Sequence, residues 1–240
     1  MKNKCDIIWL DSVDSTKNEA KRRMSSCDNM TVLSALSQTY GRGQRGNTWS
    51  SKAGENLTFS IILKDIEHIQ AASQSALSEI TALSVTELLA QYGIQAMIKW
   101  PNDIYVADRK ICGILIENSL RGNHLSSSII GIGLNINQRN FDVKLVNPTS
   151  MSLESSIETE FDTRICLERF MQIFLNHLNG FSGSEEDFQR LRDRYLSRLW
   201  RRNELRDYID LKENKEFKGT ITDLSRSGRL VLFTANGLMR

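Results

Sequence analysis

The sequence predicts an α+β fold, in which helices pack over one sheet and a small β-rich segment follows. Two patterns support this class. Short apolar runs with turn residues between them fill much of residues 5–137, and after residue 148 apolar residues repeat at three- and four-residue steps. The chain has 240 residues, 40% hydrophobic and 25% charged, which is enough to bury the core of one main domain with a small appendage.

Seven apolar runs in the first part of the chain predict strands. They cover residues 5–10, 31–37, 57–63, 96–100, 103–107, 110–119 and 126–137. The fifth and sixth runs are so close together that they must form an antiparallel hairpin. Two further short strands are expected at residues 216–221 and 229–233.

Helical spacing predicts four helices. They cover residues 18–24, a long stretch from residue 69 that Gly93 ends, residues 167–178 and residues 188–199. Ser15 and Thr16 are placed to cap the first helix, and Thr16 and Glu19 have the spacing of a capping box. Six arginines between residues 190 and 202 are expected to form a solvated face.

The loop at residues 38–51 joins two predicted strands and concentrates three glycines, two arginines and Trp49. Glycine backbone can approach a ligand closely, and arginine offers a planar fork to phosphate or carboxylate. Residues 41–46 match the G-x-G-x-x-G fingerprint of dinucleotide sites, but no helical pattern starts there. We therefore expect an irregular anion-binding loop, with Arg42 and Arg45 as its charges.

Lys99 is a second candidate for binding chemistry. It ends a predicted strand and is followed by Trp100, Pro101, Asn102 and Asp103. A lysine held at a strand end by a rigid turn is a fixed positive charge, so we expect it to be functional rather than a surface lysine.

Composition excludes several classes of protein. The net charge is +2, so nucleic acid is not an expected partner. The four cysteines are widely separated, and no apolar signal segment or membrane-length run is present, which predicts a soluble cytoplasmic protein without a membrane partner. The three histidines suggest no metal site, and no Ser/His/Asp or Cys/His pattern for nucleophilic catalysis is visible.

Four motifs in a fixed order give the chain a resemblance to the biotin protein ligases. They are QTYGRGQRGNTWSS at 38–51, KWPND at 99–103, RKICGILIE at 109–117 and GIGLNIN at 131–137. The resemblance implies a catalytic domain at residues 1–202, with a mixed sheet and flanking helices related to class II aminoacyl-tRNA synthetases. It also implies a small SH3-like β-domain at residues 203–240.

The resemblance further implies a reaction. Biotin and ATP give biotinyl-5′-AMP with the help of Mg²⁺, and the biotinyl group then passes to a lysine of a carboxylase's biotin carboxyl carrier domain. Lys99 and Arg42 are the expected catalytic charges. The implied biotin-binding residues are Ser15, Thr16, Gln38, Gly41, Arg42, Lys99, Gly113, Ile114, Gly131 and Gly133, and the implied nucleotide-binding residues are Arg42, Arg45, Trp49, Lys99, Asn102 and Asn135. The sequence does not identify metal ligands.

The chain departs from the family pattern at three positions. Gln44 and Asn47 stand where many members have arginine, and Lys17 replaces the asparagine often seen after Ser-Thr. The first catalytic strand begins near Cys5, so no preceding DNA-binding helix-turn-helix is expected. A homodimer through a sheet edge is compatible with the sequence.

Two alternatives remain at this point. A lipoate or octanoate ligase or transferase shares the fold and also modifies a carrier lysine. A non-catalytic nucleic-acid-binding module could use the arginines, although the nearly neutral charge argues against it.

Overall fold

The computed structural model describes residues 5–156, 160–210 and 213–239, without the side chains of residues 45, 238 and 239. A seven-stranded mixed sheet forms its centre, in the order β1-β2-β3-β7-β6-β5-β4. β1 and β2 are parallel, and the other neighbours are antiparallel. The strands are β1 (Asp6–Val13), β2 (Thr31–Gln38), β3 (Leu57–Lys64), β4 (Met97–Lys99), β5 (Asp103–Val106), β6 (Arg109–Arg121) and β7 (His124–Leu134).

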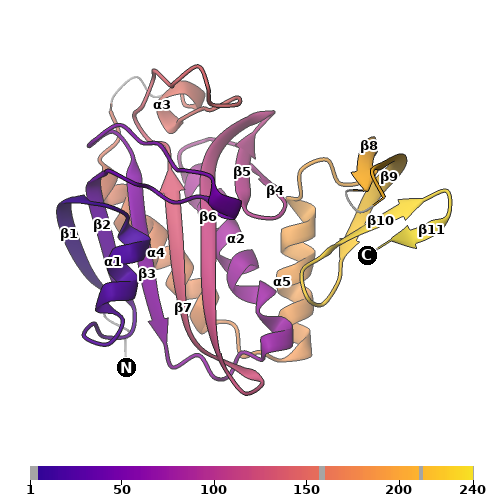
Figure 1. The fold of residues 1–240 in the computed structure, drawn as a ribbon, viewed down its shortest axis with the longest axis horizontal. Helices are drawn as coiled ribbons and strands as arrows, with labels where there is room; N and C mark the ends of the chain where they lie inside the picture. Colours follow the sequence, from indigo (N-terminus) through magenta and orange to yellow (C-terminus); the bar gives the residue numbers. More distant parts are fainter. Residues whose placement is uncertain (1–4, 157–159, 211–212, 240) are drawn as a thin grey trace.

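Helices cover both faces of this sheet (Figure 1). One face carries the main core beneath α2 (Ser75–Gln91), α4 (Thr163–Asn179) and α5 (Glu185–Ser197). The other face carries α1 (Thr16–Arg23) and a smaller core. Strand alternation explains the two cores: on β2, Val32 packs in the main core while Leu33 packs under α1.

The start of α1 differs in detail from the prediction. The helix begins at Thr16, and Ser15 is its N-cap, with its hydroxyl accepting from the backbone N–H of Lys17 at 3.2 Å. The expected capping box between Thr16 and Glu19 is not formed. The Glu19 carboxylate instead accepts hydrogen bonds from Arg22 and Arg23.

A small antiparallel sheet forms the C-terminal part of the described chain, in the order β11-β10-β9-β8. Its strands are β8 (Leu205–Asp210), β9 (Lys215–Leu224), β10 (Leu230–Thr234) and β11 (Gly237–Met239). The predicted fold class is therefore confirmed: a mixed sheet with flanking helices and a small C-terminal β-sheet. Short helical turns complete the chain at η1 (Gln44–Gly46), η2 (Ala71–Ser73) and α3 (Met151–Glu154).

Arg192 of α5 connects the small sheet to the main core. Its guanidinium forms a buried ion pair with Glu79 of α2 at 2.8 Å and also donates to the carbonyls of Leu224 and Ser225. Burial raises the pKa of Glu79, although the hydrogen bond and charge of Arg192 oppose this effect. The expectation of a solvated arginine face is therefore wrong for Arg192, which is 5% exposed.

Candidate functional site

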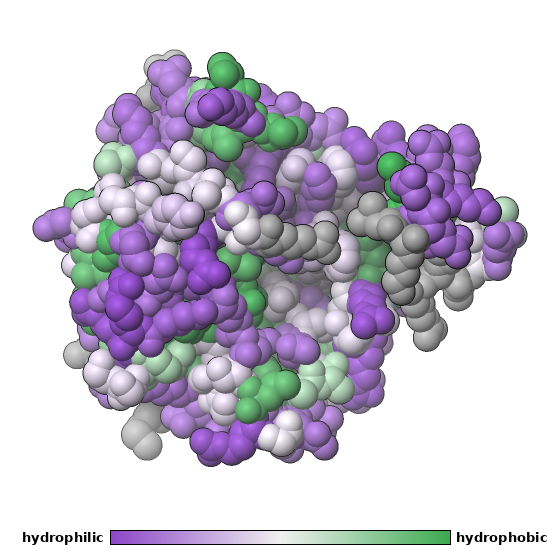
Figure 2. Space-filling model, in the orientation of Figure 1, coloured by the Kyte–Doolittle hydropathy of each residue, from purple (hydrophilic) through white to green (hydrophobic). Residues whose placement is uncertain are grey.

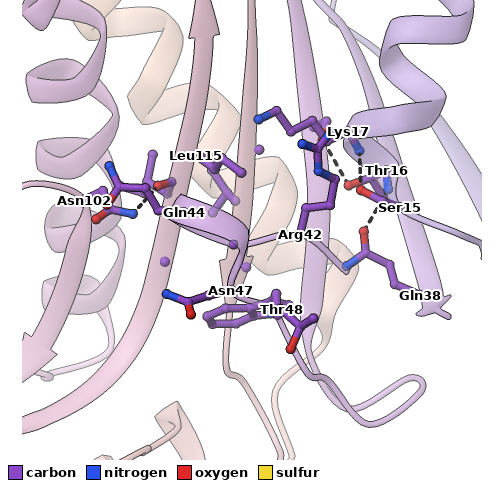
Figure 3. A pocket seen from close by; sticks show the side chains of 18 of the residues that line it. Ser15, Thr16, Lys17, Gln38, Arg42, Gln44, Asn47, Thr48, Asn102 and Leu115 are labelled. Atoms are coloured by element: carbon purple, nitrogen blue, oxygen red, sulfur yellow. Dashed lines mark hydrogen bonds between the residues drawn. The ribbon is translucent and has the colours of Figure 1, made fainter. Parts of the chain in front are cut away.

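A cavity lies beside the start of α1, over the middle strands of the large sheet (Figure 3). Its walls come from the start of α1, the loop after β2, and strands β3, β5, β6 and β7. The lining residues are Ser15, Thr16, Lys17, Gln38, Arg42, Gly43, Gln44, Asn47, Thr48, Trp49, Ser60, Asn102, Asp103, Lys110, Gly113, Ile114, Leu115, Gly131, Ile132 and Gly133.

One end of the cavity is rich in hydroxyl and amide groups. The backbone N–H of Thr16 donates to Gln38 Oε1 at 2.8 Å, and the Thr16 hydroxyl lies 3.0 Å from that of Ser60. The N-cap position of Ser15 fixes the chain here. Figure 3 shows Ser15, Thr16, Lys17, Gln38 and Arg42 grouped on this side, with Gln44 and Asn102 across the cavity. This end can hydrogen-bond a polar ring.

Two glycines make the floor of the cavity, and Trp49 stands on them. A Cβ atom at Gly133 would lie 2.2 Å from Trp49 Cε2, and one at Gly113 would lie 3.0 Å from Trp49 Cζ3. Such distances exclude a side chain at Gly133 while the indole keeps its place. Both glycines line the cavity, as expected for its walls, but the indole of Trp49 fills the space over them.

The loop after β2 is folded back on itself rather than extended. Gly43 N–H donates to Asn47 O at 2.7 Å, and Trp49 N–H donates to Gly41 O at 3.0 Å. A Cβ at Gly41 would lie 2.3 Å from Trp49 O, so glycine is required for this close approach. Gly41 thus shapes the loop but does not line the cavity itself.

Lys110 provides the positive charge opposite the hydroxyl-rich end. Its Nζ forms an ion pair with Asp103 at 2.8 Å and lies 5.7 Å from the centre of the Trp49 ring. Arg42 lines the cavity too, and its guanidinium donates to Asn18 Oδ1 at 3.2 Å. The cavity thus offers cations for a carboxylate or a phosphate.

The expectation that Lys99 touches the ligand is not met by this geometry. Lys99 is on the edge strand β4, and its ammonium donates to the hydroxyl of Tyr105 at 3.0 Å. It also lies 5.1 Å from the centre of the Trp200 ring. Together with the aromatic partner Trp200, Lys99 lines a separate cleft beside the C-terminal sheet.

A β-bulge explains why strand alternation does not reveal Lys110. Tyr105 pairs with Lys110 and Ile104 pairs with Cys112, which leaves Ile111 without a partner across the strands. Strict alternation would put Lys110 on the core side with Cys112. The extra residue turns it to the cavity side, where Asp103 also lies.

The remaining predicted residues divide between the cavity and its surroundings. Asn102 lines the cavity, and its amide donates to Ile114 O at 2.8 Å. Asn135 does not line it, because its side chain is buried and donates to Thr149 O. The side chain of Arg45 is outside the described part of the structure. Sequence reasoning did not assign Lys17, Ser60, Asp103 or Lys110 to the ligand.

Lys17 and Glu117 form an unusual ion pair on the cavity wall. Burial is the main cause that lowers the pKa of Lys17, whereas Glu117 raises it. Burial alone would raise the pKa of Glu117, but the adjacent ammonium groups of Lys17 and Lys21 outweigh it, so the pKa falls. Figure 2 shows hydrophilic side chains gathered over the neighbouring helix α1.

Within the described residues, no group of three or more His, Cys, Asp or Glu side chains is arranged to hold a metal ion. The same part of the chain contains no helix with the length and hydropathy of a membrane span.

The fold and the cavity place the chain in a structural class, that of the biotin protein ligases. The biotin protein ligase from Aquifex aeolicus in complex with biotin and ATP superposes with a TM-score of 0.80 at 27% identity, covering 98% of this chain and 94% of that chain.

The sequence gives the particular family. A model of the biotin/lipoate A/B protein ligase family matches residues 9–135, and the chain belongs to this family. The bifunctional ligase/repressor BirA of Bacillus spizizenii is 36% identical over 137 residues, which cover 57% of this chain and 42% of that protein. The biotin–[acetyl-CoA-carboxylase] ligase of Paracoccus denitrificans is 33% identical over 130 residues, 53% of each chain. The chain spans about half the length of these curated relatives.

Proposed function

We propose that this chain is a biotin protein ligase, which activates biotin with ATP and transfers the biotinyl group to a lysine of a carboxylase's carrier domain. The observation that carries the proposal is the cavity, which combines a hydroxyl- and amide-lined end with a lysine-lined end across a glycine floor. These are the two surfaces that a neutral ring and a reacting carboxylate and phosphate require.

The hydroxyl-rich end suits the ureido ring of biotin. Ser15, Thr16 and Gln38 supply hydroxyl, backbone and amide groups there, and the backbone at Gly131 leaves room for the ring. The valeryl chain then extends toward Lys110, and the Trp49 indole must leave the surface of Gly113 and Gly133 to make room for it.

Lys110 replaces Lys99 as our candidate for the catalytic charge. The biotin carboxylate oxygen attacks the α-phosphorus of ATP, the bond to the bridging oxygen breaks, and pyrophosphate leaves. Both reactants are anions, so a fixed ammonium between them lowers the barrier by stabilising the growing negative charge. Arg42 lines the hydroxyl-rich end, so its charge lies opposite Lys110 rather than beside it. Trp49 supplies a flat face beside the nucleotide.

Mg²⁺ neutralises phosphate charge when it is bound to ATP. A magnesium ion commonly uses one or two carboxylates and otherwise the substrate's phosphates and water. Asp103 is a lining carboxylate next to Lys110, so the described residues fit this mode of binding.

The second step needs no enzyme nucleophile. The amine of the carrier lysine attacks the acyl carbon of the mixed anhydride, AMP leaves, and the amine loses a proton. The protein must keep water away from the adenylate until the carrier arrives. The loop that carries Trp49 is suited to this role.

Four finer proposals accompany this function. The partner is a biotin carboxyl carrier domain, the compartment is the cytoplasm, and a homodimer through a sheet edge is compatible with the fold. Four cysteines without disulfides support the reducing compartment. The chain is divided into a catalytic domain at residues 1–202 and a C-terminal domain at residues 203–240.

The proposal is tested by measuring pyrophosphate release with different carboxylic acids, because the family also includes lipoate ligases. We expect release with biotin, ATP and Mg²⁺, and at least about tenfold less with lipoate or octanoate. Release with lipoate but not with biotin would reverse the assignment. Salt-sensitive binding of duplex DNA without any release would instead support a non-catalytic module.

A further inference from the structure

Lys17 is a buried cation in the cavity wall, and the reaction described above leaves it without a role. The residue is 3% exposed, and its Nζ lies 2.5 Å from Glu117 Oε1 on β6. Lys21 Nζ binds the other oxygen of Glu117 at 2.5 Å. One carboxylate therefore serves two ammonium groups, and the three side chains together keep one positive charge.

The position of Lys17 leaves hydrogen-bond donors available to a ligand. Its aliphatic part runs past Gly131, where an added Cβ would lie 3.8 Å from Lys17 Cδ. An ammonium group has three donors. Although the ion pair with Glu117 is short, Nζ has no hydrogen-bond partner of good geometry among the described residues. A buried donor of this kind gains free energy when a ligand offers an acceptor.

The groups around Lys17 favour one kind of ligand. Thr16, Gln38 and Ser60 offer neutral donors and acceptors, and the charged lining residues at this end are Lys17 and Arg42. Both charges are positive. A neutral ring with a carbonyl acceptor fits here, whereas a positively charged ring would meet two like charges in a partly dehydrated site.

We propose that Lys17 is a specificity-determining residue, whose ammonium donates to the carbonyl oxygen of the head group and excludes head groups that carry a positive charge. This inference rests on the proposed function, because the head group is taken to be the ureido ring of biotin. It adds a selection by charge that an asparagine at this position would not provide.

Iminobiotin tests the inference, since a guanidine replaces the ureido group and carries a positive charge at neutral pH. Isothermal titration at pH 7 would compare biotin with iminobiotin on the wild type, Lys17→Asn and Lys17→Met. We expect the dissociation constant of the wild type for iminobiotin to be at least about tenfold larger than that for biotin. Both substitutions should reduce this ratio of dissociation constants about tenfold.

Lys21→Met is the matched control. It removes the other lysine on Glu117 but leaves Lys17 paired, and Lys21 does not line the cavity. We expect this variant to keep the wild-type ratio within about twofold. Thermal melting followed by circular dichroism establishes that each variant is folded. Lys17→Asn carries the test if the apolar substitution fails to fold.

The outcomes separate this inference from the proposed function. If the wild type binds biotin and Lys17→Asn keeps the wild-type ratio, the role of Lys17 is overturned and the ligase assignment stands. If the wild type binds lipoate but not biotin, both proposals fall. A narrowed ratio in Lys17→Asn and Lys17→Met, but not in Lys21→Met, supports the selection by charge.

Discussion

Lys99 and Lys110 flank strand β5, yet only Lys110 lines the cavity. We expect Lys110→Ala to reduce biotin-dependent pyrophosphate release by about 100-fold or more, because a fixed charge beside the reacting groups is lost. Lys99→Ala should change the rate by less than about threefold, since its ammonium interacts with Tyr105 and Trp200 instead. If pyrophosphate release is lost in Lys99→Ala and normal in Lys110→Ala, Lys99 is the catalytic charge after all.

Gly133 supports a second prediction for a single residue. An alanine there would overlap the indole of Trp49, so we expect Gly133→Ala to cost about 1–3 kcal/mol in the free energy of unfolding. The cost should largely disappear when Trp49→Ala is combined with it, which denaturant melts of the four proteins would measure. Gly131→Ala is the control, because the nearest atom to a Cβ added at Gly131 is Leu115 O at 3.4 Å, an ordinary contact distance. Equal costs at Gly131 and Gly133 would contradict the contact.

Individual site residues could be predicted only where local sequence carries the signal. Gln38, Gly113 and Gly133 are implied by the motifs through which the chain resembles the biotin protein ligases. Lys110 could not be placed by alternation because of the bulge at Ile111. The environment of Lys17 could not be predicted either, because its partner Glu117 is distant in sequence and meets it only in the folded protein.

At the scale of elements, alternation and helical spacing predicted most of the large sheet and its main helices. The long helix begins later than expected, at Ser75, after the turn at η2. Strand β8 was not predicted, since most of its side chains are exposed and its apolar residues do not alternate as a half-buried strand requires. Such a strand depends on pairing with β9, which local sequence does not encode.

The contact between α2 and α5 gives the third prediction. Arg192→Met should cost about 3–5 kcal/mol in the free energy of unfolding, because it leaves Glu79 buried without its partner. Adding Glu79→Leu should recover much of that loss. Urea melts of the single and double variants would measure both effects, and an additive loss in the double variant would contradict the pairing.

The stability lost in Arg192→Met should depend on pH. Burial raises the pKa of Glu79 above its unfolded value, so the folded state binds a proton more tightly and stability falls as pH rises between the two values. Without Arg192 this pKa rises further. The variant should therefore lose less stability at pH 5 than at pH 8, and equal losses would indicate that Glu79 is not the cause.

At the scale of the molecule, Gly228 supports the fourth prediction. It has a positive φ of 81°, an added Cβ would lie 2.7 Å from Ser75 Cβ, and its carbonyl accepts from Trp100 Nε1 at 2.8 Å. We expect Gly228→Ala to destabilise the chain by about 2–4 kcal/mol through strain and overlap, and to speed cleavage between the sheets in limited proteolysis.

Gly237→Ala is the control for Gly228→Ala. Gly237 also has a positive φ, 97°, but an added Cβ would meet no atom within 4 Å. It should cost only about 1 kcal/mol and leave proteolysis unchanged. If both variants behave alike, the contact with Ser75 does not hold the small sheet in place.

The hydrogen bonds and the ion pair of Arg192 affect how the chain unfolds when it is heated. One guanidinium binds a carboxylate of the large unit, the carbonyl of Leu224 at the end of β9 and that of Ser225 just after it, so neither part can unfold without leaving buried polar groups of the other unsatisfied. The two sheets are consequently expected to share one cooperative transition, with equal calorimetric and van't Hoff enthalpies.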